Sequence, residues 1–189
     1  MGKLTMRIWV IRLPHWWRDK QKIADDRTIG LNKLLMTLNF VGMQVIPVIY
    51  LFTPWLDFAD YRLPTKACLV FGCVGAAIFA AALWLLWRSH ADLGCNFSPE
   101  LQIRKEHSLI TGGVYRYIRH PMYSAHWLWG IAQALLLQNW VAGLVFMAVL
   151  LPLYLLRVPH EEQLMLEHFG EEYRLYMNRS SRIIPRLQR

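Results

Sequence analysis

The feature that most constrains this chain is a run of 21 residues, Ala67 to Trp87, without a single charged side chain. As a helix this run would be about 32 Å long, which matches the hydrocarbon core of a bilayer. Its small residues, among them Gly72, Gly75 and Ala76, favour close helix packing in lipid. The run therefore predicts a membrane-spanning helix, and the rest of the fold must be compatible with one.

Three further apolar runs support a membrane fold. Leu34 to Trp55 is long enough to cross the hydrocarbon core. Two shorter runs, Met122 to Gln138 and Val141 to Leu156, follow each other almost without a linker, which predicts a tight helical hairpin turning near Asn139. The composition agrees, because 55% hydrophobic and 18% charged residues lie outside the range of soluble proteins.

We therefore expect an all-α integral membrane protein with four or five transmembrane helices, including a tight C-terminal helical hairpin. All 189 residues form one predicted domain. Its expected parts are an interfacial or partial span at 1–33, spans at 34–55 and 67–87, a cytosolic segment at 88–121, a hairpin at 122–157, and a cytosolic helix and tail at 158–189. The fifth span would need the first twenty residues, whose short apolar run is interrupted by Arg12 and Pro14.

The distribution of basic residues predicts the orientation. Lysines and arginines are frequent before Leu34, between Arg88 and Arg119, and after Leu156, but rare in the loop after the first span and absent from the hairpin turn. The positive-inside rule then places the frequent regions on the cytoplasmic side, which is the inner membrane if the source is prokaryotic. The net charge of +8 does not predict a nucleic-acid partner, because the basic residues flank apolar runs and form no basic stripe.

The stretch HSLITGGVYRYIRHPMY, from His107 to Tyr123, stands directly before the third apolar run. Its glycine pair at 112–113 permits positive φ and a close backbone approach. Pro121 disfavours helical geometry at His120, so we expect the next helix to begin at or just after Pro121. The unpaired N–H groups of that helix start, beside Arg119, suit a carboxylate or other anion. An interfacial anchor, with tyrosines in an aromatic belt and snorkelling arginines, explains the stretch about as well.

A second polar stretch, RVPHEEQLMLEHFGEEYRLYMNRSSRIIP, follows the last apolar run at 157–185. Pro159 is typical of a first helical turn, so we expect a new helix there, with Glu161 and Glu162 favoured by its dipole. Arg157 and Glu161 are four residues apart and share a face only if the preceding helix continues through Pro159. A plain salt bridge at the bilayer boundary is the alternative to a functional pair.

Four polar residues stand inside the apolar runs: Asn39 and Gln44 in the first, His126 and Gln133 in the third. Polar groups at such depth usually face the bundle interior and bond between helices, and lining a cavity for a lipid-like substrate is the alternative.

Several kinds of site lack support in the sequence. HEEQL at 160–164 has Leu164 where a zinc-binding helix needs its second histidine, so we expect no metal. There is no glycine-rich dinucleotide fingerprint following a strand, and there is no hydrolase elbow.

Taken together, the two polar stretches resemble the isoprenylcysteine carboxyl methyltransferase family, in particular its short prokaryotic members. The similarity is carried by HSLITGGVYRYIRHPMY, RVPHEEQLMLEHFGEEYRLYM and RIIP, with LNFVGMQVIP and HADLGCNFS also similar. It covers roughly Leu34 to Pro185. The resemblance implies a membrane enzyme that binds S-adenosylmethionine with its cytosolic segments and takes a lipidated or apolar substrate from the bilayer.

The resemblance also implies roles for particular residues. Arg157 would orient the substrate carboxylate and Glu161 would contact the cofactor, so these two are the expected catalytic residues. His126 is a further expected substrate contact, because of its polar side chain inside the third apolar run and not because of the resemblance. The other expected cofactor contacts are Gln102, His107, Ser108, Leu109, Ile110, Tyr115, His120, Pro121, Met122 and Tyr123.

These residue types suit methyl transfer to an isoprenylated cysteine carboxylate. Such a nucleophile is already ionised and can be held in two-point fashion by an arginine. Two enzymatic alternatives remain, beside a non-enzymatic membrane scaffold. A membrane methyltransferase for phospholipid amines or another small substrate would need a proton acceptor, for which Glu162 or His160 could serve. A sterol-reductase-like enzyme would bind NADPH in place of the methyl donor.

Overall fold

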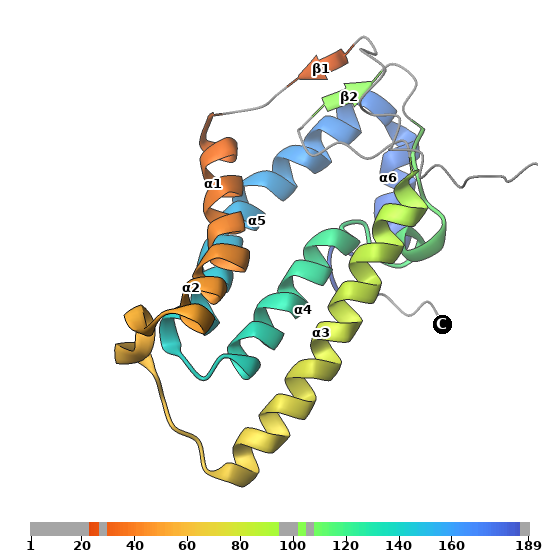
Figure 1. Cartoon of the computed structure of the whole chain (residues 1–189). Coiled ribbons are helices and arrows are strands. Elements are labelled where there is room, and N and C mark those ends of the chain that lie inside the picture. The colour runs from red at the N-terminus through yellow and green to blue at the C-terminus, as the bar shows by residue number, and fades with distance from the viewer. Residues whose placement is uncertain (1–22, 27–29, 95–101, 105–107, 186–189) are drawn as a thin grey trace, which may run out of the picture.

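The computed structural model describes residues 23–26, 30–94, 102–104 and 108–185, and apart from one pair of short strands they are helical or in short connections (Figure 1). In chain order the elements are β1 (Ile23–Asp26), α1 (Gly30–Phe40), the π-helix η2 (Val41–Val45), α2 (Ile46–Phe52), the 3₁₀-helix η3 (Pro54–Ala59), α3 (Thr65–Leu93), β2 (Gln102–Arg104), the 3₁₀-helix η5 (Gly113–Arg116), α4 (Pro121–Leu136), α5 (Trp140–Phe169) and α6 (Glu171–Arg179). The expected N-terminal interfacial segment lies mostly outside the described residues, so the fifth span stays a prediction.

Among the described residues, three helical stretches are long and apolar enough to cross a membrane: Lys33–Phe52, Thr65–Leu93 and Trp140–Phe169. The 16 residues of α4 make a helix of about 24 Å, somewhat shorter than the hydrocarbon core. The lower predicted number of four spans is therefore reached only when α4 is included. Large apolar side chains such as Leu69, Trp84 and Trp87 point outward from α3, as lipid-facing residues do. The prediction of a helical integral membrane protein is confirmed.

The first span runs without a break through α1, the π-helical turn η2 and α2. A side chain at Gly42 in that turn would meet the backbone of Phe146, with 3.2 Å between its Cβ and the Phe146 Cα, so glycine permits a close approach to α5. Gln133 Nε2 donates to the Gly42 carbonyl at 3.1 Å and to the Ala142 carbonyl at 2.7 Å. This amide joins α4, α5 and η2, which confirms the expectation that Gln133 bonds between helices.

The hairpin of α4 and α5 turns at Asn139, as predicted. Its Oδ1 accepts from the Ala142 N–H at 2.8 Å and so caps α5. Its Nδ2 donates to the Leu56 carbonyl at 2.7 Å and to Asp60 Oδ1 at 2.8 Å. One buried side chain thus ends the hairpin turn and ties it to the loop after the first span.

The expected start of a new helix at Pro159 is wrong. α5 runs without a break through Pro152 and Pro159 as far as Phe169, and Gly170, with φ of +54°, ends it. A proline inside a helix removes one backbone hydrogen bond and costs about 3 kcal/mol. Thirty residues packed against α1 and α4 outweigh that local loss. No helix end therefore separates residues 157 and 158, while the division there between membrane hairpin and cytosolic segment stays a prediction.

The polar segments gather at one end of the bundle, where Figure 1 shows α6, the β1–β2 pair and the 108–121 segment close together. The antiparallel pairing of β1 with β2 was not expected from the sequence. The tail at 181–183 runs beside the start of α4, and its bonds are Arg119 N–H to Ser181 O at 2.7 Å, His120 N–H to Arg182 O at 2.9 Å, Ser181 N–H to Tyr117 O at 3.2 Å and Ser124 Oγ–H to Ile183 O at 2.6 Å. The predicted meeting of the two polar stretches is confirmed, and its cytoplasmic location stays a prediction.

We expect Gly113→Ala to lower the unfolding midpoint in detergent by several degrees. Gly113 has φ of +60°, and a Cβ there would collide with the Asp92 carboxylate, which accepts from the Val114 N–H at 2.8 Å. Left-handed geometry alone costs an alanine about 1–2 kcal/mol. Gly112→Ala is the matched control, because Gly112 has φ of −94° and open space at its Cβ position. Equal midpoints for the two variants in thermal unfolding would contradict this account.

Candidate active site

The candidate site lies where α4 begins and α5 leaves the apolar part of the bundle. Pro121 is the first residue of α4, as predicted, and His120 before it is not helical, with φ of −121° and ψ of 61°. The His120 carbonyl accepts from the Ser124 N–H at 3.1 Å and so begins the helix. The N–H groups of this first turn have no partner within the helix, and the His120 imidazole lies beside them.

Glu161 is in contact with three other residues predicted for the site. Arg157 and Glu161 are one turn apart on the unbroken α5, and Arg157 Nε donates to Glu161 Oε1 at 2.6 Å. Tyr123 Oη donates to the same oxygen at 3.2 Å, and His120 Nδ1 lies 3.6 Å from Oε2. We call Arg157, Glu161, Tyr123 and His120 the Glu161 cluster. The Glu161 side chain is 21% exposed and that of Arg157 is 9% exposed, so the carboxylate keeps an accessible side.

The neighbouring Glu162 belongs to a different set of contacts, which we call the Glu162 cluster. Its side chain is 4% exposed, and its carboxylate lies 3.0 Å from Arg119 Nε, 3.4 Å from His120 Nε2 and 2.7 Å from Arg182 Nη2. Arg182 Nε also donates to Glu162 Oε2, at 2.9 Å, and this bond raises the pKa of the Arg182 guanidinium above its ordinary value. Glu162 thus holds the α4 start and the tail to α5.

Arg119, for which a ligand contact and a headgroup contact were both considered, is bonded within the protein. Its Nη1 donates to the carbonyls of Met177 and Ser180 at the end of α6, while its Nε binds Glu162. A guanidinium at a helix C-terminus satisfies carbonyls that the helix leaves unpaired. Arg119 therefore closes α6 against the start of α4.

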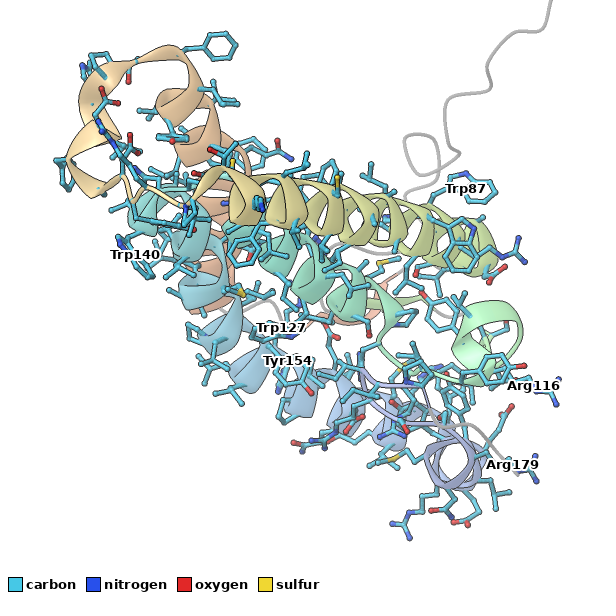
Figure 2. All side chains as sticks on the ribbon, turned by 90° about the horizontal axis from the view of Figure 1, so that it is seen from below. Trp87, Arg116, Trp127, Trp140, Tyr154 and Arg179 are labelled. Atoms are coloured by element: carbon cyan, nitrogen blue, oxygen red, sulfur yellow. The ribbon has the colours of Figure 1, made fainter. Side chains whose placement is uncertain are left out.

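An aromatic layer lies below the Glu161 cluster, toward the middle of the bundle. The Tyr154 ring is 5.8 Å from that of Tyr123 and 6.3 Å from that of Trp127, both edge to face. Figure 2 shows Trp127 and Tyr154 side by side, between α4 and α5. From α1, the Met36 thioether accepts from Arg157 Nη1 at 2.7 Å. The guanidinium therefore lies between the polar end and this layer.

Tyr115 was predicted to contact the cofactor, but its hydroxyl is turned toward α3. It donates to the Ser89 carbonyl at 3.4 Å, and Tyr176 Oη donates to the Tyr115 carbonyl at 2.6 Å. Burial raises the pKa of Tyr115, and it raises the pKa of Tyr176 to about 12. Both phenols stay neutral at physiological pH and join α3, η5 and α6.

Fewer contacts describe the positions of the other predicted residues. His126, the expected substrate contact, bonds through Nδ1 to the carbonyl of Met122, one turn earlier on α4, at 2.7 Å. Its ring faces Phe146 and not the Glu161 cluster. Pro121 is buried, Met122, Leu109 and Ile110 are half-buried, and Ser108 is exposed. Gln102 lies in β2, where only its backbone is described, and His107 lies outside the described residues.

The sequence did not reveal several members of the site. Met36, Tyr154 and Arg182 were not singled out individually, although Tyr154 precedes Arg157 by three residues and helical spacing could have placed both on one face. Within the described residues, no group of three or more histidine, cysteine or acidic side chains could hold a metal ion.

Comparison with known proteins places this geometry in a family. The model of the isoprenylcysteine carboxyl methyltransferase (ICMT) family matches residues 73–167. The protein-S-isoprenylcysteine O-methyltransferase of Saccharomyces cerevisiae is 32% identical over 149 residues, which cover 78% of this chain and 61% of that protein. The Schizosaccharomyces pombe protein of the same name is 31% identical over 121 residues, which cover 63% of this chain and 48% of that protein. The chain thus spans about half to three fifths of the length of these relatives.

A solved structure supports the same fold. The eukaryotic intramembrane Ras methyltransferase ICMT superposes with a TM-score of 0.54 at 22% identity, covering 82% of this chain and 52% of that one. The family match extends over half of the chain and includes the 107–123 stretch together with Arg157, Glu161 and Glu162. The chain therefore belongs to the isoprenylcysteine carboxyl methyltransferase family.

Proposed function

We propose that the protein transfers a methyl group from S-adenosylmethionine to the carboxylate of an isoprenylated cysteine, or of a similar apolar acceptor, at the cytosolic surface of the membrane. The observation that carries this proposal is the Glu161 cluster, in which a buried arginine and a partly accessible carboxylate meet at the membrane end of the polar segments. The names of the relatives support the same reaction.

The residues of the cluster fit the amino-acid part of the methyl donor. Glu161 keeps an accessible side and can accept from its amino group, while the N–H groups at the start of α4 can bind its carboxylate. When bound, the cofactor supplies an electrophilic methyl group on a positively charged sulfur. His120 is held from both sides, by Glu161 and Glu162, so its ring stays in one orientation at the edge of this site.

Arg157 is suited to the acceptor carboxylate. It is buried, and its fork is shared between Glu161 and the Met36 thioether, which is a weak acceptor. A substrate carboxylate is a much stronger partner for Nη1 than a thioether, because the bond is then charge-assisted on both sides. Binding would displace Met36 and hold the attacking oxygen in place. The apolar remainder of the acceptor would extend toward the aromatic layer around Tyr154.

A carboxylate acceptor needs no general base, and Glu162 is not available as one. Its oxygens bind Arg119, His120 and Arg182. Methyl transfer to a lipid amine is the second candidate, because His160 Nε2 is buried without a hydrogen-bond partner in the described part of the chain and could accept a proton.

Detergent-purified protein tests the proposal directly. We expect isothermal titration to show heat with S-adenosylmethionine and none with NADPH. Radiolabelled methyl should then enter a farnesylated cysteine analogue and not phosphatidylethanolamine. Label in the phospholipid alone would support the amine reaction, and heat with NADPH alone would support a reductase.

We expect Arg157→Ala to reduce turnover at least a hundredfold while changing the affinity for the methyl donor less than threefold. Truncation removes the group that orients the acceptor, and orientation commonly supplies several kcal/mol of the barrier reduction. Arg157→Lys should recover little, because an ammonium cannot form the two-point contact. Arg62→Ala, an exposed arginine in the loop at the other end of the bundle, is the control. Equal loss of donor affinity and turnover in Arg157→Ala would refute the assigned role.

The adjacent glutamates should respond differently to the same isosteric change. Glu161→Gln should weaken binding of the methyl donor about tenfold or more and lower the unfolding midpoint less than Glu162→Gln does, because Glu161 is partly accessible and has fewer basic partners. Glu162→Gln should lower the midpoint strongly, because removing one partner from buried charges typically costs 3–5 kcal/mol. Titration calorimetry and thermal unfolding of both variants measure the contrast. A stable Glu162→Gln protein would show that the Glu162 cluster does not hold the fold.

A further inference from the structure

The helical bundle contains polar atoms that the fold itself leaves without a partner. Among the described residues, four buried side-chain atoms have no hydrogen bond: Asn39 Oδ1, Trp127 Nε1, Gln133 Oε1 and His160 Nε2. Such groups are rare in native proteins and each requires an explanation. Inside a membrane bundle, where water is scarce, unpaired polar groups are retained chiefly for function.

Asn39 and Trp127 lie at similar depth in the helical bundle. Their depth follows from the contacts that neighbouring residues on α1 and α4 make. On α1, Asn39 is three residues from Met36, which contacts Arg157, and three from Gly42, which contacts Gln133. It therefore lies on the same face as both contacts, about 4.5 Å deeper than Met36. Asn39 thus faces inward, between the Arg157 contact and the crossing at Gln133.

On α4, Trp127 lies one turn below Tyr123, which donates to Glu161, and above Gln133. Its ring meets Tyr154, which precedes Arg157 by one turn on α5. Both unpaired groups thus belong to the layer directly below the Glu161 cluster. We call Asn39, Trp127 and Tyr154 the polar layer.

α1 and α4 both contribute to this layer. α1 and α4 each pack along α5, but they hardly pack on each other. Figure 1 shows α5 rising between them. Below the layer, the Gln133 amide and the close approach of Gly42 to Phe146 join the three helices. A group bound between Asn39 on α1 and Trp127 on α4 would therefore lie above that crossing.

The two unpaired atoms are chemically complementary to one common group. An indole Nε1–H is a donor only, and an amide oxygen is an acceptor. A secondary amide offers a carbonyl to the first and an N–H to the second. A plain hydrocarbon chain would leave both unsatisfied, which is unfavourable at a buried site. A thioether is only a weak acceptor for the indole and offers no donor to the amide oxygen.

We propose that the polar layer recognises a secondary amide of the methyl acceptor, with Trp127 Nε1–H donating to its carbonyl and Asn39 Oδ1 accepting from its N–H. This inference rests on the proposed function and narrows the substrate class to apolar carboxylates that carry an amide close to the carboxyl group. Trp127 and Asn39 are then specificity-determining residues, and Arg157 holds the carboxylate whatever the rest of the molecule.

Two matched acceptors test this assignment: N-acetyl-S-farnesylcysteine, and S-farnesylthiopropionic acid, which has the same carboxylate and thioether without the amide. We expect wild-type protein to prefer the amide acceptor by kcat/KM. Trp127→Phe keeps a ring against Tyr154 and removes the N–H, so kcat/KM for the amide acceptor should fall about tenfold, the effect of one buried hydrogen bond. The value for the acceptor without the amide should be nearly unchanged. Asn39→Leu should shift the same ratio in the same direction.

Trp129→Phe is the control, because it removes an indole N–H from the same helix where the ring instead meets Phe79 of α3, at 4.6 Å between centroids. Its ratio of kcat/KM values should equal that of the wild type. An unchanged ratio in both Trp127→Phe and Asn39→Leu, with normal wild-type turnover, overturns this inference alone. Failure of the wild type to methylate either acceptor overturns the proposed function, and this inference with it.

Discussion

The carboxylate of Glu162 is the interaction on which the polar end of this protein depends. Three basic side chains converge on it from two other parts of the chain: Arg119 and His120 from the start of α4, and Arg182 from the tail. A buried ion of this kind is costly unless every partner is present. The same partners also form the backbone bonds between 119–120 and 181–182. The site is therefore assembled only when the last residues of the described chain are docked, although those residues are far from it in sequence.

The local parts of this arrangement could be predicted from the sequence, because their causes are local. Pro121 begins a helix since its ring fixes φ and its missing N–H is not needed there. Asn139 ends the hairpin turn since its side chain caps the next helix. The charge-free run at 67–87 is helical in a membrane, because the helix is the conformation in which a single segment makes all its backbone hydrogen bonds internally. Arg157 and Glu161 were identified through family resemblance, and helical spacing then explains their contact.

The remaining parts depend on tertiary structure that the sequence pattern does not contain. Pro159 has the properties of a helix start, yet packing along α5 keeps the helix intact and so brings Arg157 and Glu161 onto one face. Arg119 has the properties of a membrane anchor, and only the position of α6 shows that it caps a helix end. Tyr115 fits a cofactor contact by motif, but its hydroxyl bonds to α3. In each case the local sequence pattern did not contain the deciding contact, because that contact is made by another helix or by a segment distant in the chain.

The continuity of α5 also explains how two adjacent glutamates acquire different tasks. Consecutive residues on a helix point about 100° apart, so Glu161 faces Tyr123 and the start of α4 while Glu162 faces Arg182 and the tail. Glu162 is engaged by three basic side chains, whereas Glu161 keeps a partly accessible side. Arg157 and Tyr154, each about one turn further into the bundle, continue the same face toward the polar layer. One helix thus presents, in order of depth, the three groups to which the proposed function assigns the cofactor, the acceptor carboxylate and the apolar chain. A helix that began at Pro159 could not keep these three in register, because Arg157 and Tyr154 would belong to a separate element.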